Sequence, residues 1–149
     1  MKWIFQSRAI PTTQTPKYLF GFVYIITFTD GSQYIGKKQI WMEKNLPALK
    51  SGIVRKGFER IYKIKKRKRV PIDHGFIEDK WRDYEGSSQY RDGRVVKKKE
   101  ILHWTFSKKQ NTYLEEKEMF SRGVLETDHY LNATIRNVYF NKEFRDGNR

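Results

Sequence analysis

Two apolar runs on either side of Asp30 and Gly31 form the clearest pattern in the chain. The runs at 20–28 (FGFVYIITF) and 33–41 (QYIGKKQIW) are rich in β-branched and aromatic residues, as β-strands usually are. Apolar residues also recur at alternate positions within 94–106, which indicates a third strand. The pattern therefore predicts a small sheet built around a hairpin.

The length of the hairpin loop decides where the two tyrosines lie. A two-residue loop would put Tyr24 and Tyr34 on opposite faces, because a slip of one residue turns every side chain over. A three-residue loop, 29–31, would end with Gly31 in the left-handed conformation and put both tyrosines on one face. We favour this loop, which pairs Tyr24 with Gly36 and leaves space beside the tyrosine hydroxyl.

The remaining segments give weaker signals. Residues 1–17 contain two prolines and several threonines and predict an irregular arm. Residues 42–57 resemble a connection. Residues 58–69 predict a basic helix, although RIYKIKK alternates as a strand would, and 71–75 would break that helix.

A further helix is expected from residue 111 to about residue 125. Its first residues include TYLE, from Thr112 to Glu115, which has the form of a capping box. Strands and helices in this order predict an α/β or α+β fold, with residues 1–149 as a single domain.

Composition excludes several classes of protein. Hydrophobic residues make up 38% of the 149 residues and aromatics 15%, which is sufficient for a folded core. The absence of cysteine excludes a disulfide scaffold and a thiolate zinc site. No run is long and apolar enough to cross a membrane, and the first residues lack the pattern of a secretory signal. We expect a cytoplasmic protein with no membrane partner and no small organic cofactor.

The charge of the chain points to a polyanionic partner. Lysine and arginine total 31 against 17 acidic residues, giving a formal net charge of +14 and a pI near 9.9. Nucleic acid is the commonest polyanion that such a protein binds. An anionic membrane surface is an alternative, but the densest basic run lacks a flanking apolar face. In that run, KIKKRKR, the expected nucleic-acid-binding residues are Lys63, Lys65, Lys66, Arg67, Lys68 and Arg69.

The hairpin residues resemble a known signature. FVY at 22–24 followed by YIGK at 34–37 is similar to the paired signature of the GIY-YIG nucleases, which include phage and intron homing endonucleases. The first half has Phe-Val where Gly-Ile is usual, and the second half is intact. YEGSSQY at 84–90, KKKEILHW at 97–104 and YLEEKEMF at 113–120 continue the similarity, most closely to small GIY-YIG proteins of large bacteriophages.

The resemblance implies a three-stranded antiparallel sheet flanked by helices and metal-dependent hydrolysis of DNA. Tyr24 and Tyr34 would be the signature tyrosines, one of them helping to activate the attacking water. Lys37 would match the lysine that follows the signature. Glu115 would match the single acid that binds a divalent cation, Mg²⁺ or Mn²⁺, and Asn132 the asparagine that closes the domain. A phage-encoded protein would act in the cytoplasm of the bacterial host.

Phosphodiester cleavage explains these residue types. It needs an activated water and neutralisation of the developing charge, and Mg²⁺ bound through one carboxylate and several waters can assist both. A phenol with a pKa near 10 needs a nearby cation to act as a base. Lys37, Lys38 and the metal are candidates: strand parity puts Lys38 on the tyrosine face, whereas the family match favours Lys37.

Several assignments have competitors. Glu115 is also the last residue of the possible capping box, and Glu116 would be an acid between apolar neighbours on the helix. Asn132 could be a turn residue. Trp81, Tyr84 and Tyr90 pack either on the sheet or on DNA.

One departure from the family concerns an arginine expected about ten residues after the second signature. Lys44 stands there, and a basic insertion spanning about 42–80 could displace the arginine, with Arg55, Arg60 or Arg82 as substitutes. The alternative to a homing-type or DNA-degrading endonuclease is a catalytically degenerate, basic nucleic-acid-binding protein. The sequence assigns no protein partner.

Overall fold

The computed structural model of the chain describes residues 1–11, 14–87 and 91–145. It divides into two compact units: unit 1 is Met1–Ile40 with Lys80–Arg149, and unit 2 is Trp41–Asp79. Unit 2 covers nearly the same residues, about 42–80, over which the sequence predicted a basic insertion. Among the residues described, no helix is long and apolar enough to cross a membrane.

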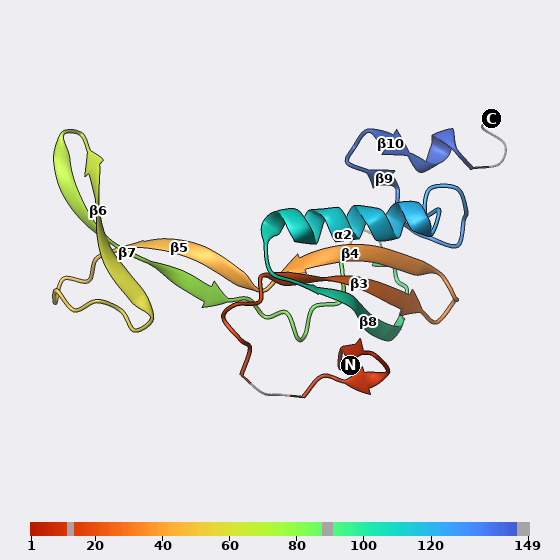
Figure 1. The fold of residues 1–149 in the computed structure, drawn as a ribbon, viewed down its shortest axis with the longest axis horizontal. Coiled ribbons are helices and arrows are strands. Elements are labelled where there is room, and N and C mark those ends of the chain that lie inside the picture. The colour runs from red at the N-terminus through yellow and green to blue at the C-terminus, as the bar shows by residue number, and fades with distance from the viewer. Residues whose placement is uncertain (12–13, 88–90, 146–149) are drawn as a thin grey trace. The chain divides into compact units, whose positions relative to one another are not determined.

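Unit 1 is built on a five-stranded sheet with the strand order β2-β1-β8-β3-β4 (Figure 1). Its strands are β1 (Ile4–Phe5), β2 (Arg8–Ala9), β3 (Gly21–Phe28), β4 (Gln33–Gln39) and β8 (Val96–Thr105). β3 pairs with β4 and β8 in antiparallel register, and β1 pairs with β8 in parallel. Every residue of β3 is buried except Thr27, because β3 has a strand on each side and packed layers on both faces.

The register of the β3–β4 hairpin confirms the three-residue loop. Tyr24 pairs with Gly36 and Ile26 with Tyr34. The Phe28 N–H donates to the Ser32 carbonyl at 2.9 Å, and Gly31 has a φ of 90°, a conformation that glycine adopts readily. Both signature tyrosines therefore lie on one face of the sheet.

The long helix α2 (Lys108–Ser121) covers the opposite face of the sheet. Its Met119 packs with Val23, Ile25 and Ile35 in an apolar core. The Ser107 side chain caps the helix by accepting a hydrogen bond from the Gln110 N–H at 3.1 Å. The predicted start at residue 111 and the predicted capping box are therefore wrong, since the serine that caps the helix lies five residues before Thr112.

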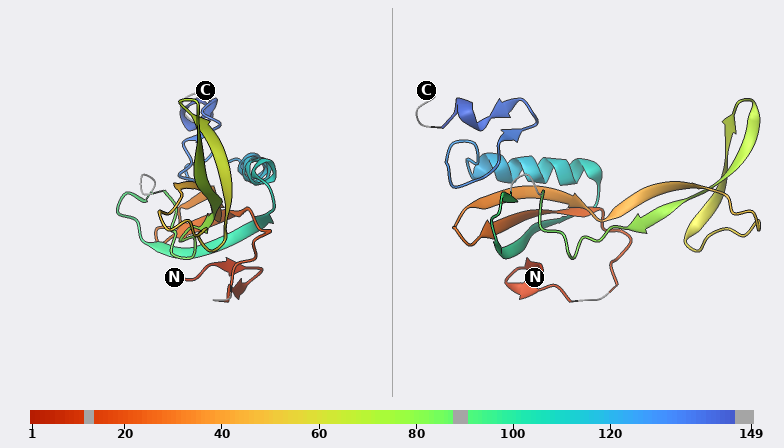
Figure 2. Two further views of the ribbon diagram at one scale, coloured as in Figure 1. Left: turned by 90° about the vertical axis from the view of Figure 1, so that its left-hand side faces the viewer. Right: turned by 180° about the vertical axis from the view of Figure 1, so that it is seen from behind.

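The tyrosine face is covered by an aromatic layer. Trp3, Phe22 and Trp81 are each at most 2% exposed, and the rings of Trp3 and Trp81 lie 5.0 and 5.6 Å from that of Phe22. Trp3 also donates from Nε1 to the Trp81 carbonyl at 2.9 Å. Figures 1 and 2 show the N-terminal hairpin on one side of the sheet and α2 on the other.

The irregular arm expected over 1–17 is therefore partly wrong, because it contains β1 and β2. Each has only two residues, too few for an alternating pattern, and β1 becomes a strand by pairing with β8. The last elements described in unit 1 are β9 (Thr134–Ile135), β10 (Tyr139–Phe140) and the 3₁₀ helix η1 (Asn141–Glu143).

Unit 2 is a three-stranded antiparallel sheet with the order β5-β7-β6. Its strands are β5 (Trp41–Pro47), β6 (Phe58–Lys65) and β7 (Lys68–Glu78). The connection expected over 42–57 is thus wrong for its first part, the basic helix over 58–69 is wrong, and 71–75 continue a strand. The alternating pattern of RIYKIKK indicated the correct structure.

The turn between β6 and β7 explains why the hairpin was hard to predict. Lys66 and Arg67 both have positive φ, 49° and 64°, as the two central residues of a type I′ turn require. Asn-Gly or Asp-Gly is the usual sequence for such a turn, and Lys-Arg gives no such signal.

A buried ion cluster stabilises unit 2. The fully buried Asp73 carboxylate accepts from Arg60 Nε and Arg55 Nη1, both at 2.9 Å. Burial opposes ionisation of Asp73, but the hydrogen bonds from Arg60 and Arg55 outweigh it and lower the pKa of the carboxyl. Both arginines are therefore engaged within unit 2.

The structure is a mixed α+β fold, as expected in class but not in strand number. The predicted three-stranded sheet is wrong: unit 1 has five strands in its sheet and unit 2 adds three more. The additional strands of unit 1 are the two short ones that depend on long-range pairing.

Candidate active site

The tyrosine face of the β3–β4 hairpin brings together three phenol rings. The Tyr24 ring centroid lies 6.3 Å from that of Tyr34 and 5.8 Å from that of Tyr84, and the Tyr24 and Tyr84 hydroxyls are 3.4 Å apart. A Cβ at Gly36 would lie 2.5 Å from Tyr24 Cζ and 3.0 Å from Tyr34 Cε1. Only glycine at this position leaves room for both rings.

Tyr24 is held in its protonated form. Its side chain is almost completely buried, with 1% of the residue exposed. Burial raises the pKa of Tyr24 well above its ordinary value, and the neighbouring Tyr34, Tyr84 and Glu115 charges raise it further. Tyr24 is thus a poor candidate for a phenolate base, whereas the half-buried Tyr34 is reachable from solvent.

Lys38 lies on the tyrosine face. It pairs with Phe22 across the hairpin, and its Nζ lies 4.6 Å from the centroid of the Tyr84 ring. A lysine over an aromatic face is attracted by the ring quadrupole. This position follows from the register that strand parity predicted.

The segment that carries Tyr84 is anchored by a buried lysine. Lys99, in β8, has no exposed surface, and its Nζ donates to the carbonyls of Arg82 and Tyr84 at 3.0 and 2.9 Å. Burial lowers the pKa of Lys99. This role was not predictable, because Lys97, Lys98 and Lys99 form a run in which only the third is buried.

Lys37 and Glu115 lie together at the helix side of β4. Lys37 Nζ donates to Thr112 Oγ1 at 2.8 Å and lies 4.0 Å from Glu115 Oε1. The two lysines therefore occupy different places: Lys38 with the tyrosines and Lys37 with the acid. The register confirms the strand-parity prediction that Lys38 shares the face of the tyrosines.

Glu115 and Glu116 have contrasting environments. Burial raises the pKa of Glu115 to about 7, partly offset by the Lys37 charge and reinforced by Glu116. Glu116 forms a two-pronged ion pair with Arg136, whose Nε and Nη2 lie 2.7 and 2.6 Å from its oxygens. Because Ser107 caps the helix, Glu115 is not used as a cap, and its carboxylate is the less firmly neutralised of the two.

Asn132 attaches the chain after α2 to the signature strand. Its Oδ1 accepts from the Ile35 N–H at 3.1 Å and its Nδ2 donates to the Ile35 carbonyl at 2.8 Å. Ile35 stands between Tyr34 and Gly36, so this buried amide holds the backbone of the signature itself. Asn132 is positioned to orient the strand rather than to touch substrate.

The candidate site has one carboxylate for metal binding, that of Glu115. Among the described residues, no three His, Asp or Glu side chains come together as a metal cluster. Mg²⁺ commonly binds through one or two carboxylates, with waters and phosphate oxygens completing the shell. The donor set around Glu115 fits that arrangement and does not fit a zinc site.

The three candidate arginines are engaged elsewhere. Arg55 and Arg60 bind Asp73 within unit 2. Arg82 donates to Thr15 Oγ1 at 3.1 Å, and its guanidinium lies 4.3 Å from the Trp81 ring centroid. Lys44 is part of β5 and pairs with Gly75.

The basic run forms the end of the β6–β7 hairpin, and all six of its predicted binding residues are exposed. Trp81 and Tyr84 pack on the sheet of unit 1, as the sequence allowed. Tyr90, and with it the end of the YEGSSQY motif, lies outside the described residues.

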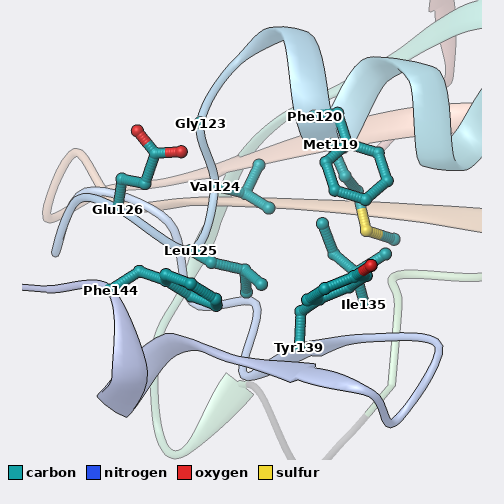
Figure 3. Close-up of a pocket in the computed structure, with 9 residues that line it drawn as sticks. All are labelled: Met119, Phe120, Gly123, Val124, Leu125, Glu126, Ile135, Tyr139 and Phe144. Atoms are coloured by element: carbon teal, nitrogen blue, oxygen red, sulfur yellow. The ribbon is translucent and has the colours of Figure 1, made fainter.

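Unit 1 also contains an apolar pocket of about 290 Å³ beyond the C-terminal end of α2. Met119, Phe120, Ile135 and Tyr139 contribute to its lining (Figure 3). The Glu126 carboxylate points away from it in Figure 3. Its lining contains one carboxylate, that of Glu126, and no basic residue.

The sheet, the paired tyrosines with Gly36 between them, and the helical glutamate define a GIY-YIG domain. The chain belongs to the SegE GIY-YIG family: the family model described as "Putative endonuclease segE, GIY-YIG domain" matches residues 3–144. Comparison with curated proteins finds no match, and comparison with solved structures finds none either. The chain is thus a member of a nuclease family.

Proposed function

We propose that this protein is a metal-dependent DNA endonuclease of the phage type, acting in homing or in DNA degradation. The observation that carries the proposal is Glu115: a carboxylate whose side chain is only 15% exposed, whose pKa is raised to about 7, and which lies beside Lys37 and close enough to Tyr24 to influence its pKa. Perturbed acids of this kind are concentrated at functional sites. Membership of a nuclease family supports the same assignment.

The tyrosines take different parts in this proposal. Tyr24 stays protonated and its hydroxyl, 3.4 Å from that of Tyr84, orients the reacting groups by hydrogen bonding. Tyr34 is the more accessible phenol and assists in removing a proton from the attacking water. Lys38 lies on the same face and stabilises negative charge there.

The acid side of the site binds the cation. Glu115 would hold Mg²⁺ or Mn²⁺, which supplies charge neutralisation at the scissile phosphate and a more acidic bound water. Lys37, hydrogen-bonded to Thr112 at 2.8 Å, is placed to contact a phosphate oxygen. Asn132 keeps the Tyr34–Gly36 backbone in position through Ile35.

The exposed end of the β6–β7 hairpin holds the substrate through its phosphates. Contacts of this kind position a protein on DNA without reading its sequence. The contributing residues are Lys63, Lys65, Lys66, Arg67, Lys68 and Arg69.

A catalytically degenerate DNA-binding protein is the second candidate. It is favoured by one observation: Arg55 and Arg60 are engaged by Asp73, and Arg82 by Trp81 and Thr15. Without the family arginine, binding could persist while turnover is lost.

The deciding experiment is incubation of the purified protein with supercoiled plasmid, with Mg²⁺ or with EDTA. We expect nicking that requires Mg²⁺ and falls at least about 100-fold in Glu115→Gln and in Tyr34→Phe. Glu126→Gln removes an exposed carboxylate from the same unit and should nick normally.

The outcomes separate the two candidates. Nicking that survives Glu115→Gln but disappears in Glu116→Gln would move the metal ligand to Glu116. A wild-type protein that binds DNA in a salt-dependent manner, yet nicks none in Mg²⁺ or Mn²⁺, would establish the binding protein instead.

A further inference from the structure

The end of the β6–β7 hairpin is a ribbon of only two strands. β5 pairs with β7 as far as the Pro47–Ile72 pair, whereas β6 and β7 continue pairing to Lys65–Lys68. Among the described residues, the segments 62–65 and 68–71 therefore have no third strand beside them (Figure 1). Two-stranded hairpins are marginally stable alone, so this ribbon gains from a partner.

The two faces of the ribbon differ in chemistry. Cross-strand partners share a face, and neighbouring residues alternate between faces. One face carries Lys63 opposite Val70 and Lys65 opposite Lys68. The other carries Tyr62 opposite Pro71 and Ile64 opposite Arg69.

The second face is apolar and exposed. Ile64 is 81% exposed and Tyr62 is 52% exposed, and the Arg69 guanidinium lies 4.2 Å from the centroid of the Tyr62 ring. A solvated basic ribbon has no need of an isoleucine and a tyrosine side by side on one face. Their exposure indicates a surface that a ligand covers.

We propose that this ribbon enters a groove of duplex DNA, with Ile64 and Tyr62 against base and sugar edges and the lysine face against phosphates. The inference rests on the DNA-binding part of the proposed function and adds a contact beyond the phosphates. It makes unit 2 a groove-binding module, in which apolar and cationic faces act on the same ligand.

The charge of the ribbon selects nucleic acid over a protein. Residues 62–71 (YKIKKRKRVP) contain six basic residues and no acid. A second copy of a chain with a net charge of +14 would be repelled at this surface. DNA offers phosphates for the lysines to contact. It also offers apolar surface, such as thymine methyl groups, for Ile64.

The dimensions of the ribbon favour the major groove. That groove is about 12 Å wide and admits a two-stranded β-ribbon, whereas the minor groove, at about 6 Å, is too narrow without deformation of the DNA. The type I′ turn at Lys66 and Arg67 keeps the leading end of the ribbon compact and places two further cations there.

The test is DNA affinity measured against salt, in EDTA so that no cleavage occurs. Fluorescence anisotropy with a labelled duplex of about 20 base pairs would be recorded between about 50 and 200 mM KCl. Full-length wild type, Ile64→Thr and the triple variant Lys63→Gln/Lys65→Gln/Lys68→Gln are compared. Threonine is β-branched, so it preserves the strand.

The two faces should give different signatures. The triple variant should reduce the slope of log affinity against log salt by about 3, because three phosphate contacts are lost. Ile64→Thr should weaken binding about tenfold and leave the slope unchanged, because the lost contact is apolar. Ile53→Thr, at a 68% exposed isoleucine elsewhere in unit 2, should bind as wild type does.

Equal binding by Ile64→Thr and Ile53→Thr would overturn the proposal. So would a concentration-dependent dimer of the wild type that Ile64→Thr disrupts in light scattering, since the face would then bind a second copy. Plasmid nicking is scored separately: a wild type that never nicks, with Ile64→Thr still weak, would leave this inference standing and remove the endonuclease.

Discussion

Tyr24 and Tyr62 both lie on β-strands of antiparallel hairpins, yet they have opposite surroundings. Tyr24 is 1% exposed and its ring contacts those of Trp3, Tyr34 and Tyr84. Tyr62 is 52% exposed, and its described ring contact is with Arg69.

The difference reflects what each region is proposed to do. A reacting phosphate needs groups already fixed in position, since reorganisation costs catalytic rate. A long anionic ligand needs exposed charges that can adapt to its backbone, and flexible lysines provide them. The hairpin of unit 1 is accordingly packed on both faces, and the ribbon of unit 2 on neither.

The largest expected effect comes from filling the space between the signature tyrosines. Gly36→Ala would place a methyl group 2.5 Å from Tyr24 Cζ and displace the ring. We expect plasmid nicking to fall at least about 100-fold, with DNA affinity in EDTA unchanged. Normal nicking by Gly36→Ala would mean that the position of Tyr24 does not matter for the reaction.

Removing the Asn132 amide should loosen the signature strand without altering the ribbon. Asn132→Ala leaves the buried Ile35 N–H and carbonyl without their partners, at a cost of about 2–4 kcal/mol of unfolding free energy. Nicking should fall about tenfold, as measured beside thermal unfolding. Asn141→Ala, which loses a 3.4 Å hydrogen bond, is the control and should change unfolding little.

Weakening the ion cluster of unit 2 should lower DNA affinity rather than the nicking of bound DNA. Asp73→Asn weakens the pairing with Arg55 and Arg60, so we expect about fivefold weaker DNA binding and melting lower by about 5 °C or more. Because the folded pKa of Asp73 is depressed, its stabilisation is present above the unfolded pKa and is lost as pH falls through the folded one.

The control for that variant is Asp128→Asn, at an exposed carboxylate 3.7 Å from Arg145, which should melt and bind as wild type does. If Asp73→Asn abolished nicking of DNA that it still saturates, the assignment of separate tasks to the two units would be wrong.

The smallest expected effect is a change in melting temperature when the Glu115 carboxylate is removed. The folded pKa of Glu115, about 7, lies above its ordinary value of 4.5, so stability falls as pH rises from the lower value to the higher one, and the full loss is present above pH 7. In EDTA, Glu115→Gln should raise the melting temperature by about 2–5 °C at pH 8 and by less at pH 5. The same shift at both pH values would show that the carboxylate ionises without cost.

Local patterns predicted the centre of the fold and missed its edges. The strands at 20–28 and 33–41 and the loop register were predictable because β-branched alternation and an Asp-Gly turn lie within a few residues of each other. The basic hairpin was misread as a helix, since its type I′ turn uses Lys66 and Arg67 rather than Asn-Gly. The helix start was misplaced because TYLE imitated a cap that Ser107 provides.

The residues of the candidate site that belong to a local signature were predictable, and those that depend on long-range contacts were not. Tyr24, Tyr34, Gly36 and Glu115 came from a signature and its spacing. Tyr84 and Lys99 were not assigned to the site, because their importance depends on contacts across 60 and 15 residues of chain. Nothing in the local sequence distinguishes Lys99 from the two lysines before it.

The sequence by itself determined the α+β class, the hairpin register, the net charge and the family. The class, the register and the charge depend on periodicity, turn chemistry and composition, which act over short distances. The family was indicated by the resemblance of the signature residues and is shown by the family model. Only the tertiary structure decided that β1 joins β8 in parallel, that Lys37 meets Glu115 while Lys38 meets Tyr84, and that the basic run is a two-faced ribbon. Each of these depends on the pairing or packing of side chains that the sequence pattern alone does not bring together.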